Sequence, residues 1–217
     1  MAVILESCAV APFYKNGFVL GCENTHEGII VDPGDEVCDL LALVEQRHLK
    51  IKYIFLTHAH LDHVSGVKRA KAALKVPIGL HRDDLFLYES AVEQGRMFGV
   101  ELNLLPPVDF FYQNVGPWLF GHYEVRAHHT PGHCPGGVCL QVNLAGSESS
   151  KLFVGDTLFA GSIGRTDLPG GELNTLMRSI TQVLLDFPDD TEIFPGHGPK
   201  TTIGHERATN PFLSGHR

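Results

Sequence analysis

The sequence predicts a single α/β domain that spans residues 1–217. Two observations lead to this prediction. Short apolar runs, most of them bounded by Gly, Pro, Asp or Asn, alternate with helical patterns along the whole chain, which is typical of interleaved strands and helices. No low-complexity linker separates two halves, and 217 residues with 43% hydrophobic content are enough to bury one sizeable core.

Seven apolar runs predict strands, because each is short and most end at turn-forming residues. In chain order they cover residues 17–22, 28–31, 53–56, 123–127, 138–142, 152–154 and 192–194. The polar patch at residues 145–150 is short enough to form the loop of a hairpin between two of these strands.

Three helices are predicted between the strands, because apolar residues recur there at the three- and four-residue spacing of one helix face. The three sets are Val37, Leu40, Leu41 and Val44; Val64, Val67 and Leu74; and Leu173, Leu176, Met177, Ile180 and Leu184.

The composition bears on partners and location. A formal charge of −8 argues against nucleic acid as a partner, because phosphate binding needs clustered Lys and Arg. No apolar stretch approaches the roughly 20 residues that cross a bilayer, and the first residues lack the features of a secretory signal. We expect a cytoplasmic protein. The five cysteines form no CxxC pair, so we expect them to be reduced and mostly buried.

A dense group of possible metal ligands follows the predicted strand at 53–56. It consists of His58, His60, Asp62 and His63. Alternate residues of an extended segment point to the same side, so His58 and His60 can bind one ion while the turn presents Asp62 and His63 to a second. One histidine alone would be read as a surface or capping residue, but four potential ligands within six positions indicate a metal site.

Three further predicted strands also end in ligand types. His133 follows a Pro-Gly turn that can direct its ring, Asp156 follows the run at 152–155, and His197 lies in a Pro-Gly-His-Gly-Pro segment. Functional groups gather at the carboxyl ends of strands in α/β proteins, and the recurrence predicts one shared site. His128 and His129 are expected to be bystanders at a strand end.

The motif set resembles that of the metallo-β-lactamase superfamily across essentially the whole chain. The signature His-x-His-x-Asp-His is intact, and the later elements follow in the family's order as Thr130-Pro131-Gly132-His133, Gly155-Asp156-Thr157 and Pro195-Gly196-His197-Gly198. The resemblance implies a four-layer αββα sandwich. It assigns His58, His60 and His133 to a first metal ion, Asp62, His63 and His197 to a second, and Asp156 to both.

The resemblance also implies roles for the two aspartates and for the ions. Asp62 and Asp156 are expected to be catalytic, because two divalent ions held together can activate a water molecule. Imidazole and carboxylate ligands suit Zn, Fe or Mn, and zinc is our first expectation. Asp32, in Val31-Asp32-Pro33-Gly34, is expected either to support a ligand or to form a turn.

Within the superfamily, residues 155–167 and 206–212 look like the glyoxalase II group, the hydroxyacylglutathione hydrolases, in its short bacterial form. This likeness implies hydrolysis of a thioester such as S-D-lactoylglutathione by a hydroxide between the ions. Arg165 is predicted to hold a carboxylate of such a substrate or else to pair with Asp167, and Arg96 is a second substrate-binding candidate. The late cations form no recognisable glutathione clamp, and the sequence makes no prediction about oligomeric state.

Other readings of the same motifs stay open. A persulfide dioxygenase with one iron shares the segment at 164–167 but usually has Pro-Ala-His-Asp where this chain has Pro195-Gly196-His197-Gly198, which favours two metals. A lactonase or β-lactamase-type hydrolase of the same fold is a further alternative. Cys134 is expected to pack rather than to bind metal. The remaining histidines are expected at surface or capping positions: His26, His48, His81, His122, His205 and His216.

Overall fold

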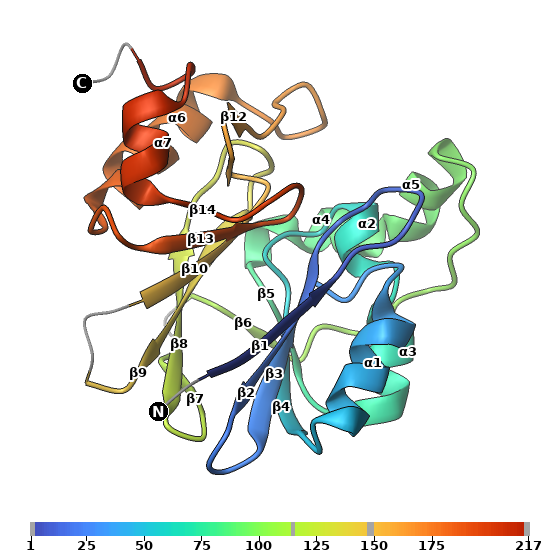
Figure 1. The fold of residues 1–217 in the computed structure, drawn as a ribbon. Coiled ribbons are helices and arrows are strands. Elements are labelled where there is room, and N and C mark those ends of the chain that lie inside the picture. Colours follow the sequence, from blue (N-terminus) through green and yellow to red (C-terminus); the bar gives the residue numbers. More distant parts are fainter. Residues whose placement is uncertain (1–2, 114–115, 147–149, 215–217) are drawn as a thin grey trace.

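The computed structural model describes residues 3–113, 116–146 and 150–214. Two six-stranded sheets face each other, and helices cover the outer side of each (Figure 1). This is a four-layer αββα sandwich, so the predicted fold class is confirmed.

The first sheet contains the N-terminal strands in sequence order. They are β1 (Val3–Cys8), β2 (Gly17–Cys22), β3 (Glu27–Val31), β4 (Lys50–Phe55), β5 (Ile78–Leu80) and β6 (Phe110–Phe111). β1 to β3 pair antiparallel, whereas β3 to β6 run parallel. The carboxyl ends of β3 and β4 therefore lie at the same edge of this sheet.

The second sheet has the strand order β14-β13-β10-β9-β8-β7. Its strands are β7 (Trp118–Phe120), β8 (Tyr123–His129), β9 (Val138–Leu144), β10 (Ser150–Gly155), β13 (Glu192–Pro195) and β14 (Thr201–Thr202), and β11 (Leu158–Phe159) and β12 (Ser162–Ile163) form a separate hairpin. β9 is antiparallel to both β8 and β10, and β13 is parallel to β10. Strands β8, β10 and β13 consequently point the same way and end at one edge.

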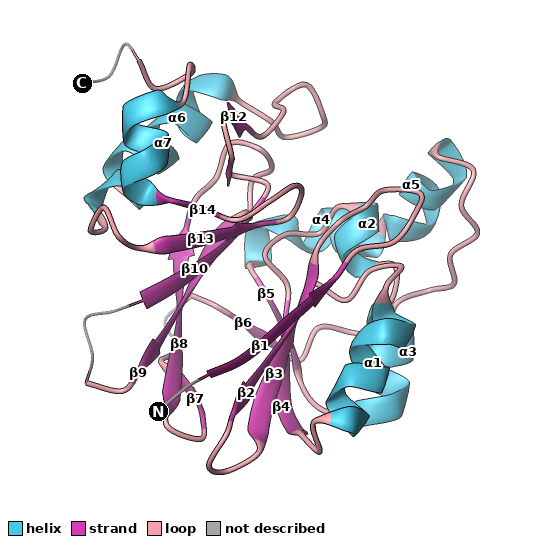
Figure 2. Ribbon diagram, in the orientation of Figure 1, coloured by secondary structure: helices cyan, strands magenta, loops and turns pink. Residues whose placement is uncertain are grey.

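Helices cover the two outer faces (Figure 2). Those beside the first sheet are α1 (Val37–Gln46), α2 (Leu61–Val64), α3 (Val67–Leu74), α4 (Leu85–Glu89) and α5 (Ala91–Met97), with a 3-10 turn at Arg82–Asp84. Those beside the second sheet are α6 (Leu173–Gln182) and α7 (Ile203–Thr209), with a 3-10 turn at Leu184–Asp186. No helix among the described residues is both long and apolar enough to cross a membrane.

Three apolar clusters fill the spaces between the four layers. The central one joins the two sheets and is rich in aromatic rings, such as Phe55 and Trp118, whose centroids lie 5.6 Å apart in an edge-to-face arrangement. A second cluster lies between the first sheet and helices α1 and α3, and a third between the second sheet and helix α6. The outer helices are thus held by the apolar faces that their sequence periodicity predicted.

All seven predicted strands are present, with bounds that differ by up to three residues. The predicted hairpin joins β9 and β10, which pair antiparallel; residues 147–149 of its loop lie outside the described residues. The helix predicted from Val64 is instead two helices, α2 and α3, separated at Ser65 and Gly66. A side chain at Gly66 would collide with the carbonyl oxygen of Gly34. Glycine therefore lets the chain turn here, where it passes close to the loop that contains Gly34.

Candidate metal centre

The two sheets bring the first group of predicted ligands together. Atoms of His58, His60 and His133 that can bind a metal all lie within 4.8 Å of one another. Nδ1 of His60 is 2.8 Å from Nε2 of His133, although the two residues are 73 positions apart. His58 and His60 follow β4 of the first sheet, and His133 follows β8 of the second.

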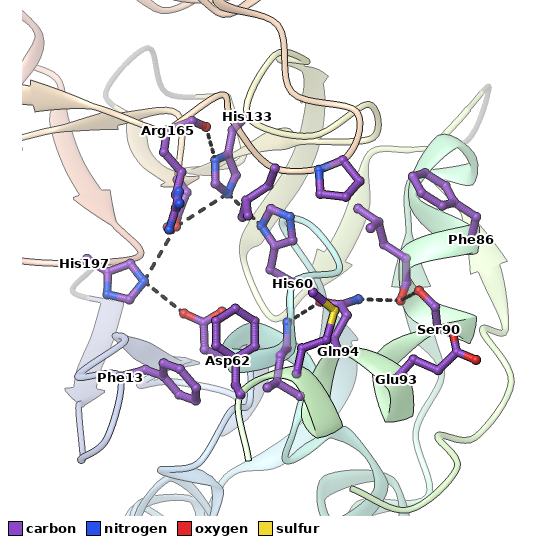
Figure 3. Close-up of a pocket in the computed structure, with 17 residues that line it drawn as sticks. Phe13, His60, Asp62, Phe86, Ser90, Glu93, Gln94, His133, Arg165 and His197 are labelled. Atoms are coloured by element: carbon purple, nitrogen blue, oxygen red, sulfur yellow. Dashed lines mark hydrogen bonds and ion pairs between the residues drawn. The ribbon is translucent and has the colours of Figure 1, made fainter. Parts of the chain in front are cut away.

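A second group forms beside the first. It contains Asp62, His63 and His197, whose ligand atoms also lie within 4.8 Å of one another. Nε2 of His197 is 3.0 Å from Oδ2 of Asp62, and Nε2 of His63 is 3.8 Å from the same oxygen. Figure 3 shows His197 and Asp62 facing each other across one end of the cavity.

Asp156 lies between the two groups. Its Oδ1 is 3.4 Å from Nε2 of His63, while its Oδ2 is 3.7 Å from Nε2 of His133 and 3.6 Å from Nε2 of His197. One carboxylate therefore reaches ligands of both groups. The cause is strand direction, because β8, β10 and β13 end at one edge and deliver His133, Asp156 and His197 there.

The electrostatics of this cluster suit a cation. Burial and the neighbouring His63 lower the pKa of His58, and burial and His133 lower the pKa of His60 to about 3. Both rings are therefore neutral, and each can donate a nitrogen lone pair to a metal ion. Burial alone would lower the pKa of His63, but the carboxylates of Asp62, Asp32 and Asp156 outweigh it and raise the pKa to about 10. The negative charge around His63 thus attracts a proton and would equally attract a metal ion in its place.

Several buried polar atoms of the cluster have no hydrogen-bond partner among the described residues. They are Nε2 of His58, His60 and His63, and Oδ1 of Asp156. Leaving such an atom unpaired costs about 1–3 kcal/mol, and native proteins rarely tolerate several together. A divalent cation would satisfy them, so these residues fit the metal ions that the motifs imply.

Asp32 supports His63 and the strand end beside it. Its Oδ2 accepts hydrogen bonds from His63 Nδ1 at 2.9 Å and from the Thr57 hydroxyl at 2.6 Å, and its Oδ1 accepts from the Thr57 backbone at 2.7 Å. With Nδ1 of His63 donating to Asp32, Nε2 is left free for a metal. The sequence predicted that Asp32 either supports a ligand or forms a turn. In the structure Asp32 supports His63, a proposed ligand.

Replacing Asp32 with asparagine is expected to weaken metal binding by about 10–100-fold, because His63 loses its charged hydrogen-bond acceptor. Metal affinity measured by competition with a chromophoric chelator tests this. Asp39→Asn, which alters an exposed carboxylate of α1, should leave the affinity unchanged. Equal affinities for the Asp32 variant and the parent protein would contradict the supporting role.

A buried ion pair stabilises the same region from the other side. Nζ of Lys15 lies 2.6 Å from Oε1 of Glu36, both side chains are 1% exposed, and Nζ also donates to the backbone oxygen of Asp32. Next to it, the side-chain amide of Asn16 donates to the carbonyl oxygens of Pro195 and Gly198 at 3.0 and 2.8 Å. The loop before β2 therefore fixes both the Asp32 turn and the His197 loop.

Asp84 joins the loops that carry the first group. It accepts hydrogen bonds from the backbone of Ala59 at 3.0 Å and of Gly136 at 2.5 Å, and from the thiol of Cys134 at 3.2 Å. Cys134 is fully buried, as expected from the sequence, and its thiol contacts Asp84. Neither Asp84 nor Lys15 was predicted, because each is a single charged residue whose partners are distant in the chain.

The two arginines predicted to bind substrate have different positions. Arg165 lines a cavity of about 380 Å³ beside the metal centre, together with His60, Asp62, His133, Asp156 and His197. Its guanidinium forms two hydrogen bonds with Asp167 at 2.7 and 2.6 Å, and its carbonyl oxygen accepts from Nδ1 of His133 at 2.7 Å (Figure 3).

Arg96 instead borders a separate hollow with Val92 and Val100. It lies on α5 between Gln94 and Met97, which both line the metal-site cavity, but it is not itself among the described residues that line that cavity. This placement gives no support to its predicted role.

A further group of potential ligands lies apart from the centre. It comprises His81, Asp83 and His129, and the rings of His81 and His129 stack 3.9 Å apart. Nδ1 of His81 accepts from the backbone of Asp83, its Nε2 pairs with Gln113, and His129 pairs with the carbonyl oxygen of Pro135. His81 is thus a capping residue, as predicted; His216 lies outside the described residues.

The fold and the cluster together define the class of this protein, a metallo-hydrolase with an αββα sandwich. Comparison with known proteins agrees, since the profile described as "Metallo-beta-lactamase superfamily" matches residues 11–197. The chain belongs to this superfamily, whose members bind divalent metals.

Similar proteins span the whole chain. A protein of Haemophilus influenzae named hydroxyacylglutathione hydrolase GloC is 37% identical, covering 97% of this chain and 98% of its own. The crystal structure of the BLEG-1 B3 metallo-beta-lactamase has a TM-score of 0.87 and 33% identity, covering 97% of this chain and 100% of its own. That of TTHA1623 in a di-iron-bound form has a TM-score of 0.80 and 39% identity, covering 96% and 100%.

Proposed function

We propose that this protein hydrolyses thioesters, such as S-D-lactoylglutathione, at a centre of two divalent metal ions. The observation that carries the proposal is the position of Asp156, whose two oxygens face His63 on one side and His133 and His197 on the other. In this proposal His58, His60 and His133 would hold one ion and Asp62, His63 and His197 the second, and Asp156 would contribute to both.

Bound ions of this kind lower the pKa of water toward ~7 and polarise a carbonyl oxygen. The chain's own residues keep the site ready for this chemistry. Asp32 and the Arg165 carbonyl oxygen accept from Nδ1 of His63 and of His133, so that each ring presents Nε2. The donor set of imidazoles and carboxylates suits zinc, iron or manganese, and one relative of solved structure was described with two irons.

A thioester fits the groups available around the centre. Hydrolysis forms a bond from the water oxygen to the carbonyl carbon and breaks the carbon–sulfur bond, and the sulfur leaves with the electron pair. A thiol has a reference pKa of about 8.5, so the thiolate leaves without a protein acid. The name of the Haemophilus influenzae relative supports the same substrate class.

The environment of Gly196 favours two ions over a single iron. A Cβ atom at this position would lie 2.3 Å from Oδ1 of Asp156 and 2.7 Å from Cε1 of His63. Only glycine lets both side chains take the positions seen here, and both are proposed ligands of the second ion. The alternative of a one-iron persulfide dioxygenase, for which the sequence resemblance implies alanine at this position, is disfavoured.

The test combines metal analysis of the purified protein with hydrolysis of S-D-lactoylglutathione. We expect about two metal ions per chain and turnover of the thioester that stops when the metal is removed with a chelator and returns when it is restored. One iron per chain, with oxygen uptake on glutathione persulfide and no thioester cleavage, would instead indicate the dioxygenase.

A β-lactam is the second candidate substrate. The observation that favours it is the likeness to the BLEG-1 B3 metallo-beta-lactamase, at 33% identity and a TM-score of 0.87. A strained amide carbonyl would be open to the same metal-assisted hydrolysis, but its leaving nitrogen would need a proton. Comparing kcat/KM for a chromogenic cephalosporin with that for the thioester decides between the two substrates.

A further inference from the structure

The cavity beside the metal centre has two unlike sides. Proposed metal ligands form one side, and the helices α4 and α5 form the other. Figure 3 shows Phe86, Ser90 and Glu93 across the cavity from His197, and Phe13, from the loop before β2, on the side of His197 and Asp62. The second side is mainly apolar, with the large side chains Phe86, Leu87, Met97 and Phe98, and Phe13 adds a further apolar ring to the lining.

Much of this apolar surface is open to solvent. Phe86 is 49% exposed, Met97 83% and Phe98 56%, although each borders a cavity that could cover it. The rings of Phe13 and Phe98 meet edge to face with centroids 6.2 Å apart, so the surface continues from α5 to the loop before β2. Exposed apolar side chains gathered at a cavity indicate an apolar ligand.

We call the side of the cavity formed by α4 and α5 the apolar wall. Its neutral polar side chains already form hydrogen bonds within the protein. Oε1 of Gln94 accepts from the backbone of Leu61 at 3.1 Å, and its Nε2 donates to the carbonyl oxygen of Leu87 at 2.8 Å. The hydroxyl of Ser90 donates to the same Leu87 oxygen at 3.1 Å. Gln94 and Ser90 therefore hold α4 and α5 against the ligand loop and leave the wall poor in donors for a polar substrate.

The charges of the cavity, outside the metal centre, offer little to an anionic substrate arm. Among the described residues that line it, Arg165 is the one Lys or Arg side chain, and its guanidinium is paired with Asp167. Glu93 adds a negative charge to the apolar side. Glutathione carries two carboxylates and one ammonium group, and its two carboxylates would meet one cation already paired and one like-charged carboxylate.

We propose that the preferred substrate carries an apolar, uncharged acyl chain. The chain lies between Phe13 and the helices α4 and α5, and the thioester carbonyl lies at the metal centre. This inference rests on the proposed thioester hydrolysis and names its substrate class: thioesters of medium-length aliphatic acids or aromatic acids. S-D-lactoylglutathione, with a polar acyl group and a charged thiol, is then a poorer substrate.

The test is a series of N-acetylcysteamine thioesters from acetyl to octanoyl, given to the metal-loaded full-length protein. Every member has the same uncharged thiol, N-acetylcysteamine, so only the acyl chain varies along the series. We expect kcat/KM to rise about three- to fourfold per methylene, the factor for burying one such group, until the cavity is filled. We also expect the octanoyl thioester to exceed S-D-lactoylglutathione by at least about tenfold.

Two variants locate the effect on the apolar wall. Phe86→Ser and Met97→Ser change exposed side chains, and each is expected to lower the octanoyl-to-acetyl ratio of kcat/KM by about tenfold. Leu119→Ser is the matched control, since Leu119 is 57% exposed on the edge strand β7, away from α4 and α5 (Figure 1). An unchanged ratio in both wall variants overturns the inference.

Direct binding separates this inference from the proposed function. Calorimetric titration of the metal-loaded protein should show octanoate binding more tightly than D-lactate, and Phe86→Ser should reduce the difference. If thioesters are hydrolysed but kcat/KM does not rise with acyl chain length, or if the two acids bind equally, the inference is overturned and the proposed function stays intact. Binding of octanoate without hydrolysis of any thioester overturns the proposed function and keeps the apolar binding site.

Discussion

Replacing Asp156 with alanine is expected to abolish hydrolysis and to lower the metal content well below two ions per chain. The reason is its position, because its oxygens face His63, His133 and His197 and no other carboxylate reaches both groups of ligands in the part of the chain that the structure describes. We expect kcat to fall by more than about 1,000-fold, which corresponds to about 4 kcal/mol of transition-state stabilisation.

Elemental analysis and steady-state kinetics on the same protein sample measure both effects. Asp190→Ala is the matched control, because it removes an exposed carboxylate from a turn outside the cavity. His60→Ala should behave like the Asp156 variant, since His60 belongs to the first group of ligands. An Asp156→Ala protein with two metals and ordinary turnover would remove Asp156 from the centre and with it the proposed arrangement of the ions.

Replacing Lys15 with methionine is expected to lower the free energy of unfolding by about 3–5 kcal/mol. The substitution leaves the carboxylate of Glu36, which is 1% exposed, without its positive partner, and breaking a buried ion pair by removing one side costs this much. The loop that also holds Asp32 and the His197 segment would lose an anchor, so metal affinity should decrease as well.

Urea denaturation of the metal-free protein measures the stability without a contribution from bound metal. The double variant Lys15→Met with Glu36→Leu should recover part of the loss, because an apolar pair of similar size leaves no unpaired charge. The recovery is partial because the Asp32 carbonyl oxygen and the Gly34 N–H lose their side-chain partners. Lys52→Met removes an exposed partner of Glu27 and should cost less than about 1 kcal/mol. Equal stability of the Lys15 and Lys52 variants would show that the buried pair does not stabilise this region.

The motifs allowed the fold class and the seven clustered side chains to be predicted. His58, His60, Asp62 and His63 are close in the chain, so their spacing alone indicated a shared site. The main strands were predictable because each is an apolar run between turn residues. The strands and helices that were not predicted are the six-residue strand β1, the short strands β5, β6, β7, β11, β12 and β14, and the helices α4, α5 and α7. Most of them are short, and two or three residues carry no clear periodicity.

The surroundings of the site depended on contacts between distant residues. Nothing in the local sequence of Lys15, Glu36 or Asp84 indicates that each is buried beside the ligand loops. Arg165 was the first candidate cation and Arg96 the second, and only the folded chain shows that Arg165 lines the metal-site cavity whereas Arg96 borders a separate hollow.

By itself, the sequence determined the chemical character of the centre, because ligand types follow strand ends in a pattern that local periodicity reveals. Only the tertiary structure decided which groups face one another, that Asp156 lies between the two sets of ligands, and that the cavity wall is apolar. The physical reason is that a pattern along the chain specifies which face of an element is buried, whereas its partners are chosen by packing among elements far apart in sequence.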